Sequence, residues 1–181
     1  MSRHVALLRA VNVGGRKLSM AELRALGGEI GLRDVATYIQ SGNVVFTSEA
    51  PAAETEQLLE RAIAERFGMT VPVIVRDAAA WAALRGANPF PDAAEMEPNR
   101  LLVCVPKQPP KNGAIETLQE RTQTGERVAE GSGSVWIHYA AGVASSKLTP
   151  TAIDRAIGSP STARNWRTVV KLGELLAAET R

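Results

Sequence analysis

The sequence has little of what several classes of protein need. Its 181 residues contain one cysteine, Cys104, so no internal disulfide and no thiolate zinc cluster can form. No run of about 18 apolar residues is present, and Arg9 interrupts the apolar stretch near the start. We therefore expect neither a membrane-spanning helix nor a signal segment, and we expect a reduced, cytoplasmic protein.

Catalytic and cofactor signatures are also scarce. The chain has two histidines, His4 and His138, and both lie in predicted strands where they fit structural packing. Cys104 lies in an apolar strand, and Ser41 lacks the G-x-S-x-G elbow and a base. Neither a P-loop nor a dinucleotide fingerprint occurs, so we expect no cofactor and no metal. Four glutamates are expected on the solvent face of one amphipathic helix: Glu54, Glu56, Glu60 and Glu65.

Charge is nearly balanced, and its distribution is more informative than its sum. The net charge of +2 is too small to imply a nucleic acid or a membrane as partner. Residues 1–47 and 142–181 each carry six basic and three acidic residues. If these ends meet in space, they form a positive, arginine-rich surface suited to phosphates and carboxylates. A compositional preference for arginine explains the excess as well.

Caps and turns organise the first half of the chain. Ser19 and Glu22 form a capping box that starts a helix, and Gly31 ends it. Ser41 and Gly42 separate two β-rich runs, which predicts a two-residue hairpin. The predicted order is a strand at 3–10, a helix at 19–31, strands at 35–40 and 43–47, a helix ending at Gly68, and a strand at 71–76. This β-α-β-β-α-β order predicts an α+β fold with a ferredoxin-like N-terminal unit.

The second half predicts a related arrangement. After a short helix at 77–85, three prolines at 87–98 mark the best boundary, which gives units 1–86 and 87–181 unless both form one compact domain. The expected elements are a strand at 100–105, a helix around 115–118, strands near 127–130 and 135–139, and two C-terminal helices. The order β-α-β-β therefore recurs, which suggests a duplication in topology.

The predicted topology brings polar residues to one edge of the first sheet. The first two strands run parallel with the third between them, so the end of strand one, the start of helix one and the hairpin turn share that edge. This places Arg16 and Lys17 near the hairpin turn as well. The candidate ligand-binding residues at this edge are Arg9, Asn12, Gly14, Gly15, Gln40, Ser41 and Asn43. A helix start preceded by glycines can hold an anion. Alternatively, the glycines only make tight loops and the amides only support the turn.

The two-residue turn has a consequence for register. It pairs Gln40 with Asn43 and turns their side chains to one face of the sheet. Thr37, Ile39, Val44 and Phe46 are then expected on the opposite, core-facing side.

A second polar group lies near the C-terminus. Its candidate ligand-binding residues are Lys147, Arg164, Asn165 and Arg167. Arg167 and Lys171 share one helix face, where their repulsion costs a few tenths of a kcal/mol, so a nearby anion would offset it. The alternative is that Asn165 caps the last helix and that the cations face solvent.

Five segments carry a resemblance to a known family: LLRAVNVGG at 7–15, MAEL at 20–23, YIQSGNV at 38–44, KLT at 147–149 and RNWRT at 164–168. In this order they resemble the domain of unknown function 1697 family, from about residue 3 to residue 178. Ala10 departs from the pattern, because the family usually has glycine there. The resemblance implies a bacterial, cytosolic α+β protein with a ferredoxin-related fold and no established activity, and it assigns no site residues.

Four functions remain open at this point. The first is a binding protein in which both polar groups line one basic pocket for a phosphate- or carboxylate-bearing small molecule. The second is binding of single-stranded nucleic acid, which needs exposed aromatic residues on the sheet, whereas Phe46 is expected in the core. The third is an enzyme with Lys147 as its titratable group, and the fourth is a scaffold that binds other proteins. We expect no membrane as partner.

Overall fold

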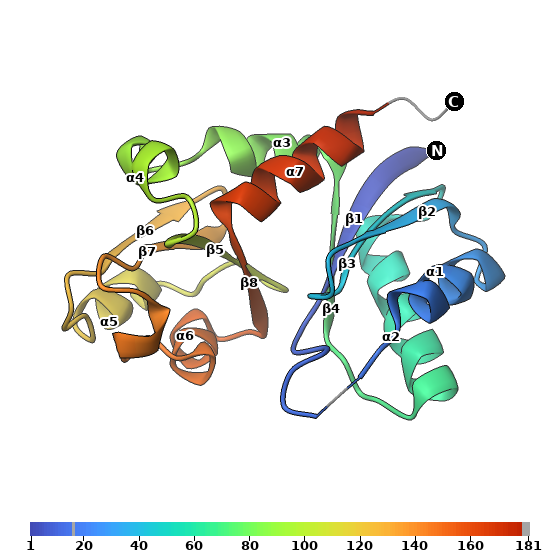
Figure 1. Cartoon of the computed structure of the whole chain (residues 1–181), viewed down its shortest axis with the longest axis horizontal. Helices are drawn as coiled ribbons and strands as arrows, with labels where there is room; N and C mark the ends of the chain where they lie inside the picture. The colour runs from blue at the N-terminus through green and yellow to red at the C-terminus, as the bar shows by residue number, and fades with distance from the viewer. Residues whose placement is uncertain (16, 179–181) are drawn as a thin grey trace. The chain divides into compact units, whose positions relative to one another are not determined.

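The computed structural model describes residues 1–15 and 17–178, so Arg16, which the sequence places near the hairpin turn, lies outside the described residues (Figure 1). The chain divides into two units. The first consists of Met1–Trp81 and the chain from Leu172 onward, and the second is Ala82–Lys171. Within the described ranges, no helix has the length and apolar character needed to cross a membrane.

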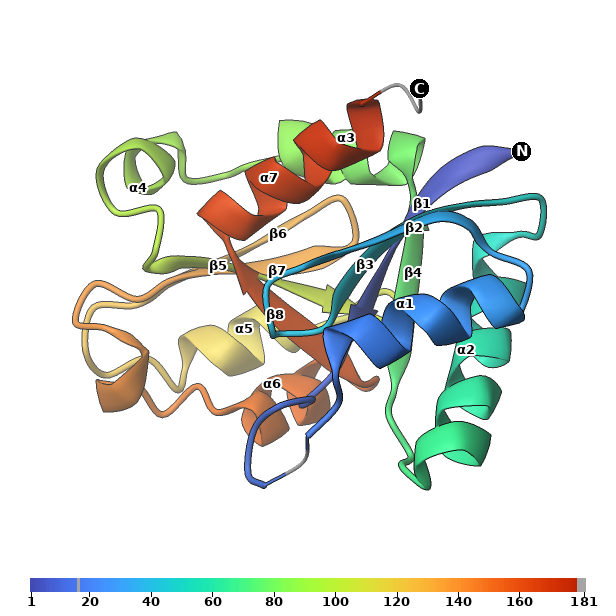
Figure 2. The same ribbon diagram turned by 45° about the vertical axis from the view of Figure 1, so that its right-hand side comes forward.

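The first unit is built on an antiparallel sheet with the strand order β2-β3-β1-β4. Its elements are β1 (Ser2–Leu8), α1 (Met20–Glu29), β2 (Arg33–Tyr38), β3 (Asn43–Ser48), α2 (Ala52–Phe67) and β4 (Val73–Asp77). α1 and α2 cover the same face of the sheet (Figure 2). The order and directions are those of a ferredoxin-like unit, so the predicted fold class is confirmed.

Apolar side chains from every layer close the core of this unit. Leu8, Phe46 and Val75 on the sheet pack with Leu23 of α1 and Ile63 of α2, and all are at most 1% exposed. Burying such side chains contributes about 1.5–3 kcal/mol each. The caps predicted from the sequence hold both helices in place. Ser19 Oγ accepts the amide of Glu22, and Gly68 ends α2 in a left-handed conformation.

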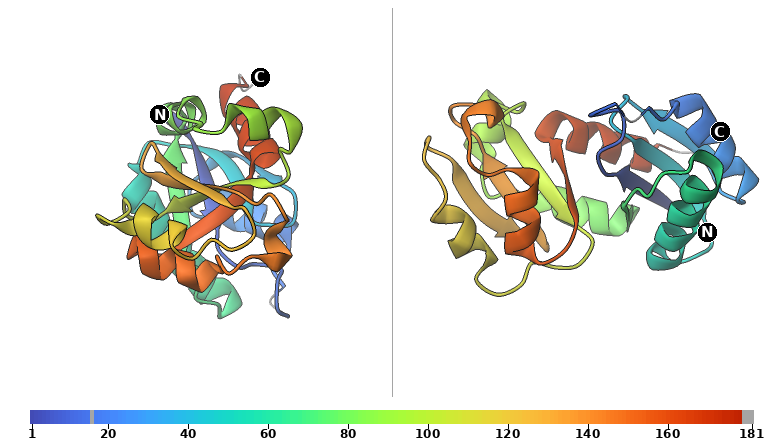
Figure 3. Two further views of the ribbon diagram at one scale, coloured as in Figure 1. Left: turned by 90° about the vertical axis from the view of Figure 1, so that its left-hand side faces the viewer. Right: turned by 90° about the horizontal axis from the view of Figure 1, so that it is seen from below.

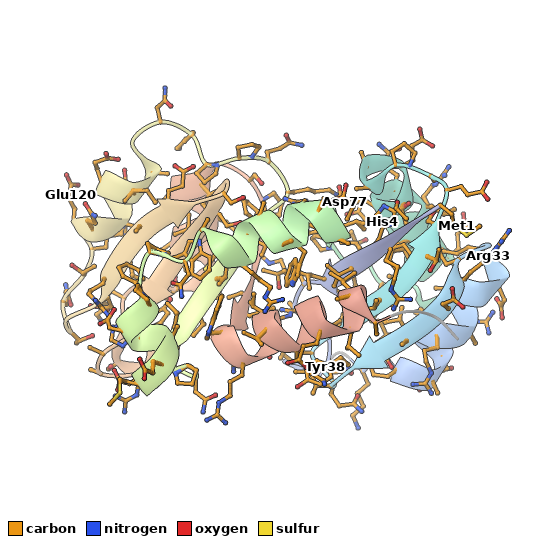
Figure 4. The ribbon with its side chains drawn as sticks, turned by 90° about the horizontal axis from the view of Figure 1, so that it is seen from above. Met1, His4, Arg33, Tyr38, Asp77 and Glu120 are labelled. Atoms are coloured by element: carbon orange, nitrogen blue, oxygen red, sulfur yellow. The ribbon has the colours of Figure 1, made fainter. Side chains whose placement is uncertain are left out.

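The predicted two-residue turn between β2 and β3 is wrong. Tyr38, not Gln40, lies opposite Asn43, which leaves residues 39–42 as the loop. Figure 4 marks Tyr38 at the end of β2, where this loop begins. Val44 and Phe46 do lie in the core, but Ile39 is 49% exposed because its positive φ takes it out of the strand.

Two glutamates expected on the solvent face of α2 have a structural role instead. β4 is an edge strand, and edge amides left unpaired invite aggregation. Glu60 Oε1 accepts the amide of Val73 and Glu56 Oε1 accepts the amide of Val75, both at 2.9 Å. The helix therefore supplies the partners that a further strand would have supplied.

The second unit repeats the topology of the first. Its antiparallel sheet has the order β6-β7-β5-β8. The elements are α4 (Pro91–Met96), β5 (Leu101–Pro106), α5 (Ala114–Gln119), β6 (Arg127–Gly131), β7 (Ser134–His138), η1 (Val143–Ser145), α6 (Pro150–Ile157) and β8 (Ser161–Asn165). α5 and α6 cover one sheet face (Figure 3), where Leu118 and Ile153 pack against Ile137. The predicted recurrence of topology is thus confirmed.

Two helices run from one unit into the other. They are α3 (Ala78–Gly86), where Asp77 Oδ1 accepts the amide of Ala80, and α7 (Trp166–Ala177). β8, which leads directly into α7, was not predicted. Its sequence, Ser-Thr-Ala-Arg-Asn, has no apolar alternation, although Thr162 and Arg164 are buried.

Gly42→Ala tests how closely the β2–β3 loop approaches β1. Gly42 has φ +76, and a Cβ there would lie 2.5 Å from Val11 Cγ2 and 2.8 Å from Leu8 Cβ. We expect a loss of about 2–4 kcal/mol in the free energy of unfolding, measured by urea denaturation. The matched control is Gly68→Ala, because Gly68 has φ +64 but nothing within 4 Å, and it should cost only about 1 kcal/mol. Equal losses for the two variants would contradict the close approach.

Candidate functional site

The side chain of Asn12 joins the loop after β1 to the loop between β2 and β3. Its Nδ2 donates to the backbone oxygens of Gln40, at 2.7 Å, and Leu18, at 3.0 Å. Its Oδ1 accepts the amide of Leu18 at 2.8 Å. The structure thus brings together Asn12 and Gln40, two residues of the first candidate group.

The backbone at this edge adopts uncommon conformations. Ala10, Asn12 and Ile39 have φ of 52°, 57° and 52°. Among the described non-glycine residues, only Asp34 and Ser132 also have positive φ. A left-handed conformation costs about 1–2 kcal/mol for an ordinary residue, and a β-branched isoleucine there is a clear outlier. Such strain is concentrated at functional sites in many proteins.

Two glycines follow in the same loop. Gly14 and Gly15 have φ of 59° and 87°, and glycine adopts such a conformation without steric cost.

A depression of about 440 Å³ lies beside these loops. It is lined by Asn12, Lys17, Leu18, Ser19 and Gln40. Among residues 1–15 and 17–178, Lys17 is the charged residue of this lining, and no carboxylate contributes to it. The first backbone amides of α1, which begins directly after Ser19, add partial positive charge there.

The remaining candidates of the first group support the loops. Asn43 is completely buried, and its Nδ2 donates to Tyr38 O at 3.0 Å and to Ser41 Oγ at 2.9 Å. These bonds close the loop of residues 39–42. The backbone amide of Arg9 donates to Pro72 O at 3.0 Å, which extends the pairing of β1 with β4. Neither Arg9 nor Asn43 contributes to the lining of the depression.

The second candidate group lies on and around β8 in the other unit. Arg164 is 8% exposed, and its Nη1 donates to Thr162 Oγ1 and to Ala163 O. Burial lowers the pKa of Arg164 to about 10. Asn165 Oδ1 accepts the amide of Thr168 at 3.0 Å, so it caps α7 as the alternative interpretation had it. Two members, Lys147 and Arg167, are exposed.

Sequence reasoning missed a buried carboxylate near Lys147. Glu126 is 8% exposed and accepts the amides of Gln123 and Thr124 and the hydroxyl of Ser146. Burial by itself raises the pKa of Glu126, but these hydrogen bonds outweigh it and lower the value to about 2. Ser146 Oγ also accepts the amide of Leu148, so this network fixes the loop that carries Lys147.

His138 belongs to a chain of charged side chains. Arg127 Nε donates to its Nδ1 at 3.3 Å, which leaves the proton on Nε2 for the bond to Glu97, at 2.8 Å. That hydrogen bond, assisted by Arg100, lowers the pKa of Glu97 below its ordinary value. Arg127 also forms two hydrogen bonds with Asp92. Both ring nitrogens of His138 are occupied, so the imidazole fastens residues 92–100 to the sheet rather than offering a free base.

Other reactive groups are enclosed. Burial raises the pKa of the Cys104 thiol to about 12, so it is not a nucleophile near neutral pH. His4 stacks on Phe46 with ring centroids 5.6 Å apart. In residues 1–15 and 17–178, no group of three or more His, Cys, Asp or Glu side chains could hold a metal ion.

Comparison with known families identifies the family of this chain. Residues 1–136 match the model of a family described as "Protein of unknown function (DUF1697)". The chain belongs to this family. The match covers three of the five segments that suggested the resemblance, and no curated protein matches the chain.

A solved structure shows the same fold as this DUF1697 chain. It is described as the structure of conserved bacterial protein SP0830 from Streptococcus pneumoniae. The two chains are 23% identical, with a TM-score of 0.78 over 98% of this chain and 99% of the other. At this identity the likeness concerns the fold alone.

Ala10 stands where the resemblance leads us to expect glycine, and it is left-handed with φ of 52°. Glycine adopts that conformation without steric cost, whereas alanine is strained there. That both candidate groups line one pocket stays a prediction.

Asn12→Asp tests the two hydrogen bonds that Asn12 Nδ2 donates. Aspartate keeps the acceptor for Leu18 and tolerates positive φ, but it places an oxygen against the carbonyls of Leu18 and Gln40. We expect the free energy of unfolding in urea to fall by about 2 kcal/mol or more. Asn165→Asp is the matched control and should be neutral or slightly stabilising, because Asn165 only accepts at a helix start. Equal effects would refute the bridging role of Asn12.

Glu126→Gln tests the buried carboxylate by pH. The pKa of Glu126 is about 2 in the folded protein and near 4.5 ordinarily, so its charge stabilises the fold above pH 4.5. This stabilisation declines as the pH falls from 4.5 toward 2. The stability difference between the native protein and the variant should therefore be large at pH 7 and shrink on acidification. Glu120→Gln, at the exposed Glu120 labelled in Figure 4, should leave stability unchanged.

Proposed function

We propose that this DUF1697 protein binds a small anionic ligand, carrying a phosphate or carboxylate, in the depression beside α1. The observation that carries the proposal is the lining itself. A lysine and neutral hydrogen-bonding groups surround about 440 Å³ of space, with no carboxylate from the part of the chain that the structure describes. This volume lies within the usual range of small-molecule sites.

Each wall supplies a different kind of donor. Lys17 provides the charge, the Gln40 side chain and the Ser19 hydroxyl provide neutral donors, and the start of α1 provides backbone amides. Asn12 is committed to its backbone partners and therefore holds the walls rather than the ligand. The strain at Ala10 and Ile39 supports a binding role, because strained backbone persists where it positions a site.

The exposed side chains favour this ligand over single-stranded nucleic acid. Nucleic-acid modules stack bases on exposed aromatic rings. In the described part of the chain, the large exposed hydrophobic residues are all aliphatic: Met1, Val13, Ile39, Met96 and Val143. Phe46 lies in the core, as its register predicts.

Binding of phosphate monoesters and carboxylates, followed by NMR shifts or calorimetry at low salt, tests the proposal. Lys17→Ala should weaken binding about tenfold or more, because it removes a charge-assisted hydrogen bond. Lys111→Ala, a change of the same charge in the second unit, should leave the affinity unchanged. If Lys17→Ala and Lys111→Ala behave alike, or if no anion binds, the proposal is wrong. Loss of affinity in Lys147→Ala would support a pocket that includes the second candidate group.

A further inference from the structure

Two exposed apolar residues are chain neighbours of residues that line the depression. Val13 is 57% exposed and directly follows Asn12, and Ile39 is 49% exposed and directly precedes Gln40. The hydrogen bond of 2.7 Å between Asn12 Nδ2 and Gln40 O holds together the two loops that carry Val13 and Ile39. Leu18 contributes an apolar wall to the same depression.

Ile39 is unfavourable in the free protein for two separate reasons. Its φ of 52° is disfavoured for a β-branched side chain, and about half of its surface faces water. Asparagine would relieve both costs, since it tolerates left-handed backbone and is polar. Ile39 therefore combines an unfavourable backbone conformation with an apolar side chain exposed to water. Such a residue next to a depression of ligand size is expected where a ligand covers it.

We propose that the ligand carries an apolar or aromatic group joined directly to its anionic group, and that Val13 and Ile39 cover that apolar group. This inference rests on the proposed function and narrows the ligand to aryl or alkyl phosphates and carboxylates. Lys17 takes the anion and the two aliphatic side chains take the remainder. The charge of the lining and the size of the depression argue for a small anion rather than a protein surface.

The test compares two monoesters of equal charge, phenyl phosphate and glycerol 3-phosphate, by calorimetry on the full chain. We expect phenyl phosphate to bind about tenfold more tightly. Covering one face of its ring removes enough apolar surface from water to account for a tenfold difference in affinity. In Ile39→Asn this preference should disappear while the affinity for glycerol 3-phosphate is kept. Met96→Asn, at a residue 79% exposed in the other unit, should keep the preference.

Each outcome is decisive. Equal affinities for the two esters in the native protein would overturn the inference and leave the proposed function standing, whereas no binding of either ester would overturn both. Ile39→Asn should also unfold at the same or a higher urea concentration, because it relieves strain. A lower midpoint would show that Ile39 supports the fold and would likewise overturn the inference.

Discussion

The hydrogen bonds of the Asn12 amide are the constraint on which the candidate site depends. One planar group joins the chain before α1 to the chain after β2, with three bonds between 2.7 and 3.0 Å. The loops it joins contain two strained residues, Ala10 and Ile39, and each of them opposes folding by about 1–2 kcal/mol. Without a bridge, these loops would relax into ordinary turns, and the depression would lose the wall that Gln40 provides.

Topology was predictable because it follows from short-range signals. The capping box at Ser19, the glycine at position 68 and the alternation of the strands each act within a few residues, and all agree with one another. The length of the β2–β3 loop was not predictable by this means. Asn43 sends its side chain back to Tyr38 O and Ser41 Oγ and so closes a longer loop than two residues. Ile39 looked like a core residue because apolar alternation carries no information about the sign of φ.

Buried polar groups were the other failure of sequence reasoning, and the cause is physical. Glu56 and Glu60 look like any solvent-facing glutamates on an amphipathic helix until the edge strand beside them is known. Glu126 is stabilised by backbone amides and by Ser146, twenty positions away, which leave no pattern in the sequence. β8 was missed for the same reason, because its burial comes from its place in the sheet rather than from apolar residues. Of the candidate site, topology predicted that Asn12 and Lys17 lie near Gln40, whereas Ser19 was predicted only as a helix cap and joins the site through the depression.

The second unit provides an internal comparison for the first. Both units have the same strand order, yet the loop corresponding to residues 39–42 is a plain hairpin. There Gly131 pairs with Ser134, and the two intervening residues, Ser132 and Gly133, both have positive φ, as a type I′ turn requires. Between β5 and α5, Gly113 alone is left-handed. The fold itself therefore needs neither a longer loop nor a strained alanine and isoleucine. Their presence at one edge of the first unit is specific to that edge, which is the physical reason to look for the ligand there.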